Sequence, residues 1–262
     1  MKVEGLTVVV TGGAAGIGRA LALRFHRDGA KAVVVADIDG AGAEAVGQMA
    51  GGAGFACDVA REDDVARLIG ETERRFGPIG LYCSNAGIFG TPDAPGNVAA
   101  EPDDAWMRGW SVNVMGHVHA ARVLVPRMKA RGSGAFLFTV SAAGLLSQIG
   151  NSIYSTTKHA ALGFAESLAI AHRDDGIRVF VLCPQGVDTA LLREAGDGPQ
   201  NRDGVLTPDQ VAASVMDALE RDSFLILPHP QVAGYFQRKA ADYDRWIAGM
   251  AKLKRSLGAK GD

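Results

Sequence analysis

Tyr154 and Lys158 lie four residues apart in a segment, NSIYSTTKHAALGF, whose pattern indicates a helix. Positions i and i+4 of a helix share one face, so the phenol and the ammonium project into the same space. A free tyrosine, with a pKa of about 10, is poorly matched to proton transfer at neutral pH, and a neighbouring ammonium favours its phenolate. The pair therefore suits general acid–base chemistry, although a surface tyrosine beside a lysine has the same spacing.

Ser141 directly follows an apolar run at residues 135–140 that predicts a strand. Open α/β sheets bind their ligands at the carboxyl ends of the strands. A hydroxyl there can hold a substrate oxygen and stabilise the charge that develops on it. The alternative is an ordinary turn at the end of a strand.

The glycine-rich segment TGGAAGIG, residues 11–18, stands between a predicted strand and a predicted helix. Glycines let the backbone turn tightly and approach a pyrophosphate, and the helix N-terminus presents free N–H groups and a positive dipole end to it. Because the segment has the strand and helix that the motif requires, it predicts a dinucleotide-binding loop.

Asp37 ends the second predicted strand, about 20 residues beyond the glycine loop, where a carboxylate binds the adenosine ribose hydroxyls. Such a carboxylate would repel a 2′-phosphate, and the neighbouring Ala15 and Ile38 supply no compensating positive charge. We therefore expect NAD in preference to NADP. In the alternative, Asp37 only caps the next helix, a role that Asp39 could fill.

The composition excludes several classes of protein. The chain has 262 residues, 47% of them hydrophobic, so it is not expected to be disordered. Its net charge of -2 gives no reason to expect nucleic acid or an anionic membrane as a partner. Its three cysteines form no C-x-x-C pair, which favours reduced, buried thiols in a cytoplasmic protein. No signal peptide is indicated at the start, and no apolar run approaches the ~18 residues of a membrane-spanning helix.

Short β-branched runs alternate with amphipathic segments along the chain. This rhythm predicts one α/β domain over residues 1–262, with a Rossmann-type, doubly wound parallel sheet of about seven strands and helices on both faces. The expected strands are 7–10, 32–36, 54–57, 80–83, 135–140, 178–182 and 223–227. The expected helices are 16–28, 42–50, 61–76, 103–131, 152–174 and 208–221, with loops at 88–102 and 196–204.

Residues 228–262 form a C-terminal tail that predicts one more helix. Large side chains recur there at roughly helical spacing, at Val232, Phe236, Lys239, Tyr243, Trp246 and Met250. We expect this stripe to pack in the core or between subunits, and the tail either to reach a neighbouring subunit or to close over the site.

The motifs, taken in order, resemble the short-chain dehydrogenase/reductase family, in its compact NAD(P)-dependent oxidoreductase branch, over roughly residues 6–227. The cofactor loop T-G-x-x-x-G-x-G of that family matches residues 11–18, and its N-A-G segment matches residues 85–87. The catalytic tetrad of the family matches Asn113, Ser141, Tyr154 and Lys158.

The resemblance implies hydride transfer between NAD and a secondary alcohol or its ketone. Tyr154 would act as general acid and base, Ser141 would hold the substrate oxygen, Lys158 would also bind the nicotinamide ribose, and Asn113 would position a proton-relay water. The implied cofactor-binding residues are Gly12, Gly16, Ile17, Gly18, Asp37, Asp58, Val59, Asn85, Ala86, Gly87, Tyr154, Lys158, Pro184, Val187 and Thr189. The resemblance to the family also implies that the protein is a homo-oligomer, either a tetramer or a dimer.

One segment departs from the family pattern P-G-x-V-x-T: here it reads Pro184-Gln185-Gly186-Val187-Asp188-Thr189. Gln185 replaces the expected glycine, which leaves its backbone conformation open. Its side chain is either a substrate contact or a solvated loop residue. No metal site is expected, because His117 and His119 do not share a helix face and the chain has no cysteine cluster.

The expected substrate pocket is mostly apolar. It comprises residues 88–95, 143–148 and 185–196, with the apolar side chains Phe89, Leu145, Leu146, Ile149, Leu191 and Leu192 and one candidate cation, Arg193. This lining favours a steroid, cyclic or lipid-like secondary alcohol over a polyol. The alternatives are a 3-oxoacyl thioester reductase and a non-catalytic NAD-binding protein on the same fold. A serine hydrolase is disfavoured, since the chain has no G-x-S-x-G elbow.

Overall fold

The computed structural model describes residues 1–196 and 198–258; Asp197 of the expected polar loop and the last four residues of the expected tail lie outside the described residues. Its core is one parallel sheet in the order β3-β2-β1-β4-β5-β6-β7, which confirms the predicted doubly wound fold. The strands are β1 (Thr7–Thr11), β2 (Ala32–Asp37), β3 (Ala53–Ala56), β4 (Ile79–Ser84), β5 (Gly134–Thr139), β6 (Ile177–Leu182) and β7 (Leu225–Ile226). The strand order reverses between β1 and β4, and the crevice at such a point binds ligands.

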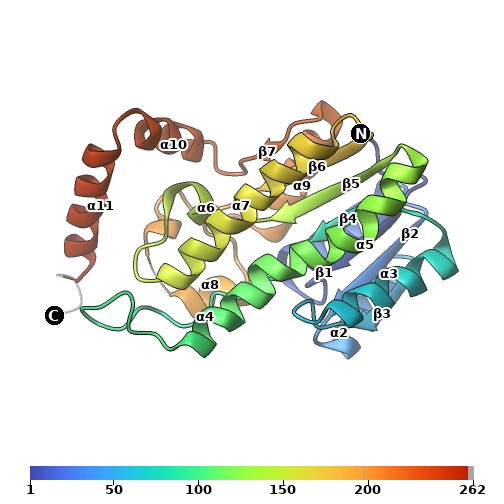
Figure 1. Ribbon diagram of the computed structural model, residues 1–262, viewed down its shortest axis with the longest axis horizontal. Coiled ribbons are helices and arrows are strands. Elements are labelled where there is room, and N and C mark those ends of the chain that lie inside the picture. Colours follow the sequence, from blue (N-terminus) through green and yellow to red (C-terminus); the bar gives the residue numbers. More distant parts are fainter. Residues whose placement is uncertain (197, 259–262) are drawn as a thin grey trace.

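Helices cover both faces of the sheet (Figure 1). One face packs against α1 (Gly16–Arg27), α2 (Gly40–Met49) and α9 (Pro208–Arg221), and the other against α3 (Glu62–Phe76), α5 (Gly116–Arg131) and α7 (Ser152–His172). In β1, Val8 and Val10 pack on the face covered by α1, α2 and α9, and Val9 packs on the face covered by α3, α5 and α7. All three side chains are fully buried. Burial on both faces explains why these strands are apolar throughout and do not alternate.

The expected helix at residues 103–131 is interrupted. It comprises α4 (Asp103–Trp110), a π-helical turn (Ser111–Met115) and α5. Asn113 lies in this turn, and π-bulges of this kind occur frequently at functional sites. Three short elements also fall in stretches without a predicted helix: α6 (Ala143–Leu146), α8 (Ala190–Ala195) and a 3₁₀ turn (Pro199–Asn201).

The C-terminal tail forms two helices where one was expected, α10 (Gln231–Ala241) and α11 (Tyr243–Gly258). Asp242 breaks the helix by taking an extended conformation. The predicted stripe is therefore divided, with Val232 and Lys239 buried and Tyr243 58% exposed. The two helices form an arm, here called the C-terminal arm, that projects from the end of the sheet (Figure 1). Across the described residues, no helix is long and apolar enough to cross a membrane.

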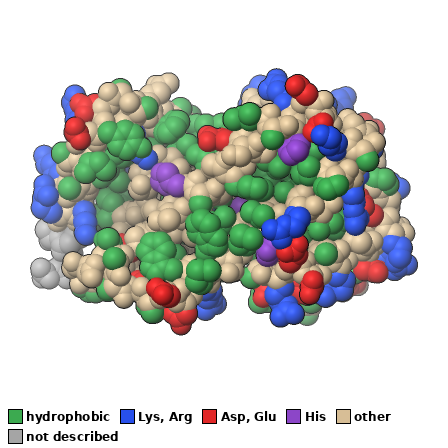
Figure 2. Space-filling view, in the orientation of Figure 1, with side chains coloured by type: hydrophobic (Ala, Val, Ile, Leu, Met, Phe, Trp, Pro, Cys, Tyr) green, Lys and Arg blue, Asp and Glu red, His purple; other side chains and the backbone are tan. Residues whose placement is uncertain are grey.

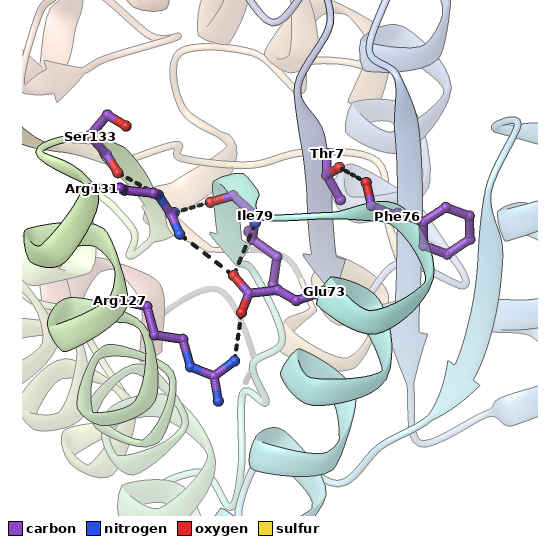
Figure 3. A network of polar contacts seen from close by, with 7 residues as sticks. All are labelled: Thr7, Glu73, Phe76, Ile79, Arg127, Arg131 and Ser133. Carbon is purple, nitrogen blue, oxygen red and sulfur yellow. Dashed lines mark hydrogen bonds and ion pairs between the residues drawn. The ribbon is translucent and has the colours of Figure 1, made fainter.

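A carboxylate on α3 connects that helix to α5 and to strand β4 (Figure 3). Glu73 accepts hydrogen bonds from the Ile79 backbone N–H at 3.2 Å and from Arg127 at 2.6 Å, and Arg131 lies 3.6 Å away. Arg131 also donates to the Ile79 carbonyl. These contacts hold α3 and α5 against the start of β4, the strand that leads into the site.

The three cysteines are free and buried, as expected. Burial raises the pKa of the Cys57 and Cys183 thiols to about 12. They are therefore uncharged side chains of the core at neutral pH.

Candidate active site

The glycine loop leads from β1 into α1, as predicted. Ala15 caps α1 without any side-chain hydrogen bond, and the first turn carries no acidic residue, so the positive end of the helix is free to face an anion. Gly12 has φ +62°, and a Cβ there would lie 2.7 Å from the Cα of Ala86. At Gly18 a Cβ would lie 2.2 Å from the Gly12 carbonyl oxygen. Only glycine allows the loop to pack this closely.

Asp37 holds the glycine loop from the end of β2. Its Oδ2 accepts the Ala14 N–H at 3.0 Å and its Oδ1 accepts the Asp39 N–H at 3.1 Å. Asp39 caps α2 by accepting the Gly42 N–H at 3.0 Å, so Asp37 is not needed as the cap. The half-buried carboxylate of Asp37 instead lines the cavity beside the glycine loop.

Asn85 connects the ends of three strands. Its Nδ2 donates to the carbonyl oxygens of Thr11 at 3.0 Å and Gly12 at 3.2 Å, and its Oδ1 accepts from the Thr139 hydroxyl at 2.9 Å. The Thr11 hydroxyl accepts the backbone N–H of Asn85 at 3.0 Å. The glycine loop, β4 and β5 are thus fixed relative to one another at the crevice.

A cavity of about 640 Å³ runs along this crevice. It is lined by all of the predicted cofactor residues except Gly18, which lies behind the loop: Gly12, Gly16, Ile17, Asp37, Asp58, Val59, Asn85, Ala86, Gly87, Tyr154, Lys158, Pro184, Val187 and Thr189. A Cβ at Gly87 would lie 3.3 Å from Lys158 Nζ and take space from this cavity. The close glycine backbone, the free helix N-terminus and the acidic group at β2 fit a dinucleotide.

Part of this lining was not predicted from the sequence. Arg108 and Ser111 also face the cavity from the helix and π turn that carry Asn113, as do Ala190, Leu191 and Leu192 of α8. The missed helix α8 has a recognisable start, because Thr189 accepts the Leu192 N–H and caps it.

Tyr154 and Lys158 lie on one face of α7, as their spacing predicts. Lys158 Nζ lies 5.6 Å from the centre of the Tyr154 ring and donates to the Thr139 carbonyl at 3.1 Å. The Ser141 side chain lies close enough to Tyr154 to lower its pKa, and its Oγ accepts the Ala143 N–H at 3.0 Å. The ring of Tyr154 packs on Phe89, 5.0 Å away between centroids. The structure therefore brings Ser141, Tyr154 and Lys158 together.

Asn151 places this helix. Its side chain accepts the Tyr154 N–H at 2.8 Å, which caps α7, and it donates to the Phe89 carbonyl at 3.0 Å. Asn151 is fully buried, so it fixes both the first turn of α7 and the segment that packs on the tyrosine ring. This role of Asn151 was not predicted from the sequence, although an asparagine just before a helical pattern is a typical cap.

Burial dominates the charge states of the pair. Desolvation raises the pKa of Tyr154 to about 12, while the neighbouring Ser141 side chain acts in the opposite direction. Desolvation also lowers the pKa of Lys158 to about 8. The sequence led us to expect a lowered tyrosine pKa, but within the polypeptide itself the loss of solvation is the largest influence and raises it.

The buried lysine should make stability depend on pH. Lys158 has its ordinary pKa of 10.5 in the unfolded chain and about 8 in the folded one, so between these values the unfolded chain binds one more proton and rising pH stabilises the wild type. Lys158→Met lacks this gain. We expect the free energy of unfolding of the variant, relative to wild type, to fall by about 2–3 kcal/mol between about pH 7 and 10. Urea denaturation across this range measures it.

The matched control is Lys252→Met, which removes an exposed lysine of α11. The free energy of unfolding of this control, relative to wild type, should stay constant over the same pH range. If the difference in free energy of unfolding between Lys158→Met and wild type also stayed constant with pH, burial would not lower the pKa of Lys158.

Asn113 is buried and lines neither of the two cavities described here. Its Oδ1 accepts the Ile88 N–H at 2.9 Å, and its Nδ2 donates to the Ile88 carbonyl at 3.0 Å and to Thr157 at 3.1 Å. These contacts hold the segment after β4 against the π turn. The role of Asn113 in positioning a water stays a prediction.

Gln185 is half-buried and lines both cavities, so it is not a solvated loop residue. Its backbone lies outside the left-handed region, so no glycine is required there. The backbone N–H donates to Nδ1 of the buried His229 at 3.2 Å. Its buried Oε1 has no hydrogen-bond partner among the described residues.

A second cavity, of about 580 Å³, adjoins the first at Ser141, Tyr154, Gln185 and Leu191. Phe89, Leu146 and Leu191 line it as predicted. Ala143, Ser147, Gln148 and Gln185 of the predicted ranges line it as well. Three of the predicted apolar side chains do not: Leu145 is buried in the core, Leu192 lines the cofactor cavity, and Ile149 lines neither. Arg193 also lies outside the lining and pairs with Asp188 at 3.0 Å.

The C-terminal arm forms the opposite wall of this second cavity. Its apolar contribution is Trp246, Met250 and Leu253. The arm thus closes over the site, one of the two positions expected for it. Its Lys239 donates to the Leu145 carbonyl at 2.7 Å and lies 3.3 Å from His159 of α7, which fastens α10 to the body.

Comparison with known proteins agrees with this site. The family model described as short chain dehydrogenase matches residues 6–200. A 1-deoxy-11-beta-hydroxypentalenate dehydrogenase of Streptomyces exfoliatus is 35% identical over 234 residues, 86% of this chain and 84% of that protein.

Two solved structures have the same fold. A short chain dehydrogenase/reductase of Burkholderia phymatum in complex with NAD has a TM-score of 0.83 and 27% identity, over 93% of this chain and 96% of that one. A 3-ketoacyl-(acyl-carrier-protein) reductase of Brucella melitensis complexed with NADH has a TM-score of 0.78 and 28% identity, over 87% and 96%.

Proposed function

The chain belongs to the short-chain dehydrogenase family, and from this premise we propose how its own residues carry the reaction. It is an oxidoreductase that transfers a hydride between NAD and a secondary alcohol or the matching ketone. The observation that supports our assignment of the residues is the junction of the two cavities. Ser141 and Tyr154 line both, so their hydroxyls lie where a dinucleotide and an apolar substrate would meet.

Each residue at the junction has a separate task. We assign Tyr154 as the general acid and base, because its hydroxyl is buried beside both Ser141 and the substrate cavity. Ser141 holds the substrate oxygen and stabilises charge on it. Lys158 holds the nicotinamide ribose and supplies a fixed positive charge to the buried site. When bound, the nicotinamide supplies the hydride acceptor or donor.

The other residues bind the cofactor or position its site. The glycine loop and the N-terminus of α1 hold the pyrophosphate, and Asp37 holds the adenosine ribose. Because the Asn113 side chain is engaged by Ile88 and Thr157, we assign it a positioning role.

The substrate is an apolar secondary alcohol, such as a steroid, cyclic or lipid-like compound. The aromatic and aliphatic lining of the second cavity, with Phe89, Leu146 and Trp246, supports this class over a polyol. A 3-oxoacyl thioester reductase is the second candidate, favoured by the likeness to the Brucella melitensis reductase.

The test is formation of reduced nicotinamide from NAD and from NADP with a panel of steroidal, cyclic, aliphatic and polyol alcohols. A 3-oxoacyl thioester with NADH and NADPH is assayed in the reverse direction. We expect turnover with NAD on an apolar alcohol. Faster reduction of the thioester would favour the second candidate, and NAD binding without turnover on any substrate would contradict both.

We also propose a homo-oligomer, a dimer or tetramer, that pairs through α4 and α7. Large apolar side chains exposed on these helices support it: Met107 is 58% and Ile170 is 82% exposed. Sedimentation that shows only monomer would contradict this. The three free thiols support a cytoplasmic location, which cell fractionation would test.

A further inference from the structure

Three arginines line the substrate cavity on the side of the C-terminal arm. They are Arg238 of α10, Arg245 of α11 and Arg202 just after the 3₁₀ turn. The only acidic side chain in the described lining is Asp242, whose carboxylate already accepts the Arg245 backbone N–H at 2.9 Å. Asp203 lies behind this wall and accepts the Tyr235 hydroxyl at 2.9 Å. With both carboxylates counted, guanidinium groups still outnumber them at this side of the cavity, in a chain whose net charge is -2.

These arginines have no carboxylate partners among the described residues. Arginines elsewhere do: Arg127 pairs with Glu73 and Arg193 with Asp188. The guanidinium of Arg238 lies 4.8 Å from the centre of the Tyr235 ring, which also lines the cavity and holds that group at the wall. Lys and Arg side chains are also dense on the arm, at the left of the surface in Figure 2.

The rest of the lining has a different character. Ser141 and Tyr154 line the cavity from the body of the molecule, and Arg238 and Arg245 line it from the arm. The apolar side chains of the lining are those of Phe89, Leu146, Leu191, Trp246, Met250 and Leu253, and Ser147, Gln148, Gln185 and Gln200 also line it. A ligand that matches this lining has an alcohol at one end, an apolar body, and a group that accepts hydrogen bonds from guanidinium at the other. The planar guanidinium fork fits a carboxylate.

We propose that the substrate is an apolar secondary alcohol that carries a carboxylate at the end remote from its hydroxyl, and that Arg238 and Arg245 bind this carboxylate. The inference rests on the proposed function and narrows its substrate class. It corrects the expectation that Arg193 is the candidate cation, because the cationic wall belongs to the arm. The arginines then select among alcohols that the apolar lining alone would accept equally.

The binding test uses two fluorescent probes with the same aromatic body. The first, 1-anilinonaphthalene-8-sulfonate, has an anionic group, and the second, N-phenyl-1-naphthylamine, lacks it. Each is titrated with saturating NAD, so that the cofactor cavity is filled. In Arg238→Gln/Arg245→Gln we expect the anionic probe to bind about tenfold more weakly, and the neutral probe to change less than about twofold.

Two controls separate charge from structure. Arg238→Lys/Arg245→Lys keeps the charges and should retain most of the affinity for the anionic probe. Arg193→Gln removes a cation outside the cavity and should change neither probe. Equal loss of both probes would show that the arginines only support the arm, and no loss of either would show that they bind no anion. Either result overturns the proposal.

The kinetic test compares a hydroxylated steroid carboxylic acid with its methyl ester. We expect kcat/KM for the acid to exceed that for the ester by about tenfold, mainly through KM, and the double glutamine variant to abolish this advantage. If the ester reacts as well as the acid, the proposal that the substrate carries a carboxylate is contradicted. The oxidoreductase function is not affected by that result. If no alcohol reacts although NAD binds, the proposed function fails, and the probes still decide whether the arm binds an anion.

Discussion

Tyr154→Phe should reduce kcat by about a thousandfold while NAD binding stays close to that of wild type. The change removes one hydroxyl, which lies beside Ser141 at the junction of the two cavities. Without it, the alcohol proton has no acceptor when the hydride leaves. The measurement is steady-state turnover with the best alcohol of the panel, together with NAD affinity from the quenching of protein fluorescence.

Packing should survive this change, because the ring of Tyr154 keeps its contact with Phe89. Tyr82→Phe is the matched control. Tyr82 is fully buried in β4, and its hydroxyl has no hydrogen-bond partner among the described residues. We expect this control to keep full turnover and to match or exceed the wild-type stability. Near-normal turnover in Tyr154→Phe would mean that another group moves the proton.

The fold and the cofactor half of the site were predictable from the sequence because local patterns determine them. Buried parallel strands leave uniform apolar runs, and the glycine loop needs glycine where a side chain would collide with the backbone, as at Gly12 and Gly18. Asp37 was predictable because its distance from that loop follows from the length of one βαβ unit.

The substrate half was less predictable because it depends on how distant segments pack. The arm joins the cavity only because Asp242 breaks the tail into two helices and Lys239 fastens the first to α6 and α7. No local pattern shows that Arg238 and Trp246 face Tyr154 across a cavity. The interruption of the helix expected at residues 103–131 was unpredictable for the same reason. It places Asn113 against a backbone segment 25 residues away in the chain.

Asp37→Asn should change the preference for NAD over NADP by about a hundredfold. The variant loses a charged hydrogen-bond acceptor for the ribose hydroxyls, which weakens NAD binding by about tenfold. It also removes the negative charge that repels a 2′-phosphate, which strengthens NADP binding by a similar factor. The measurement is kcat/KM for each cofactor at a fixed concentration of alcohol.

Asp39→Asn is the control that separates charge at the ribose from charge in the neighbourhood. Asp39 lies two residues on, caps α2 through Gly42 and does not line the cavity. Its removal changes the net charge by the same amount, so a general electrostatic effect on NADP would appear equally in both variants. If only Asp37→Asn changes the preference, the discrimination comes from a carboxylate in contact with the ribose. If both variants change it equally, NADP is disfavoured by the field of the whole β2 edge, and the contact with Asp37 has no special part in the choice.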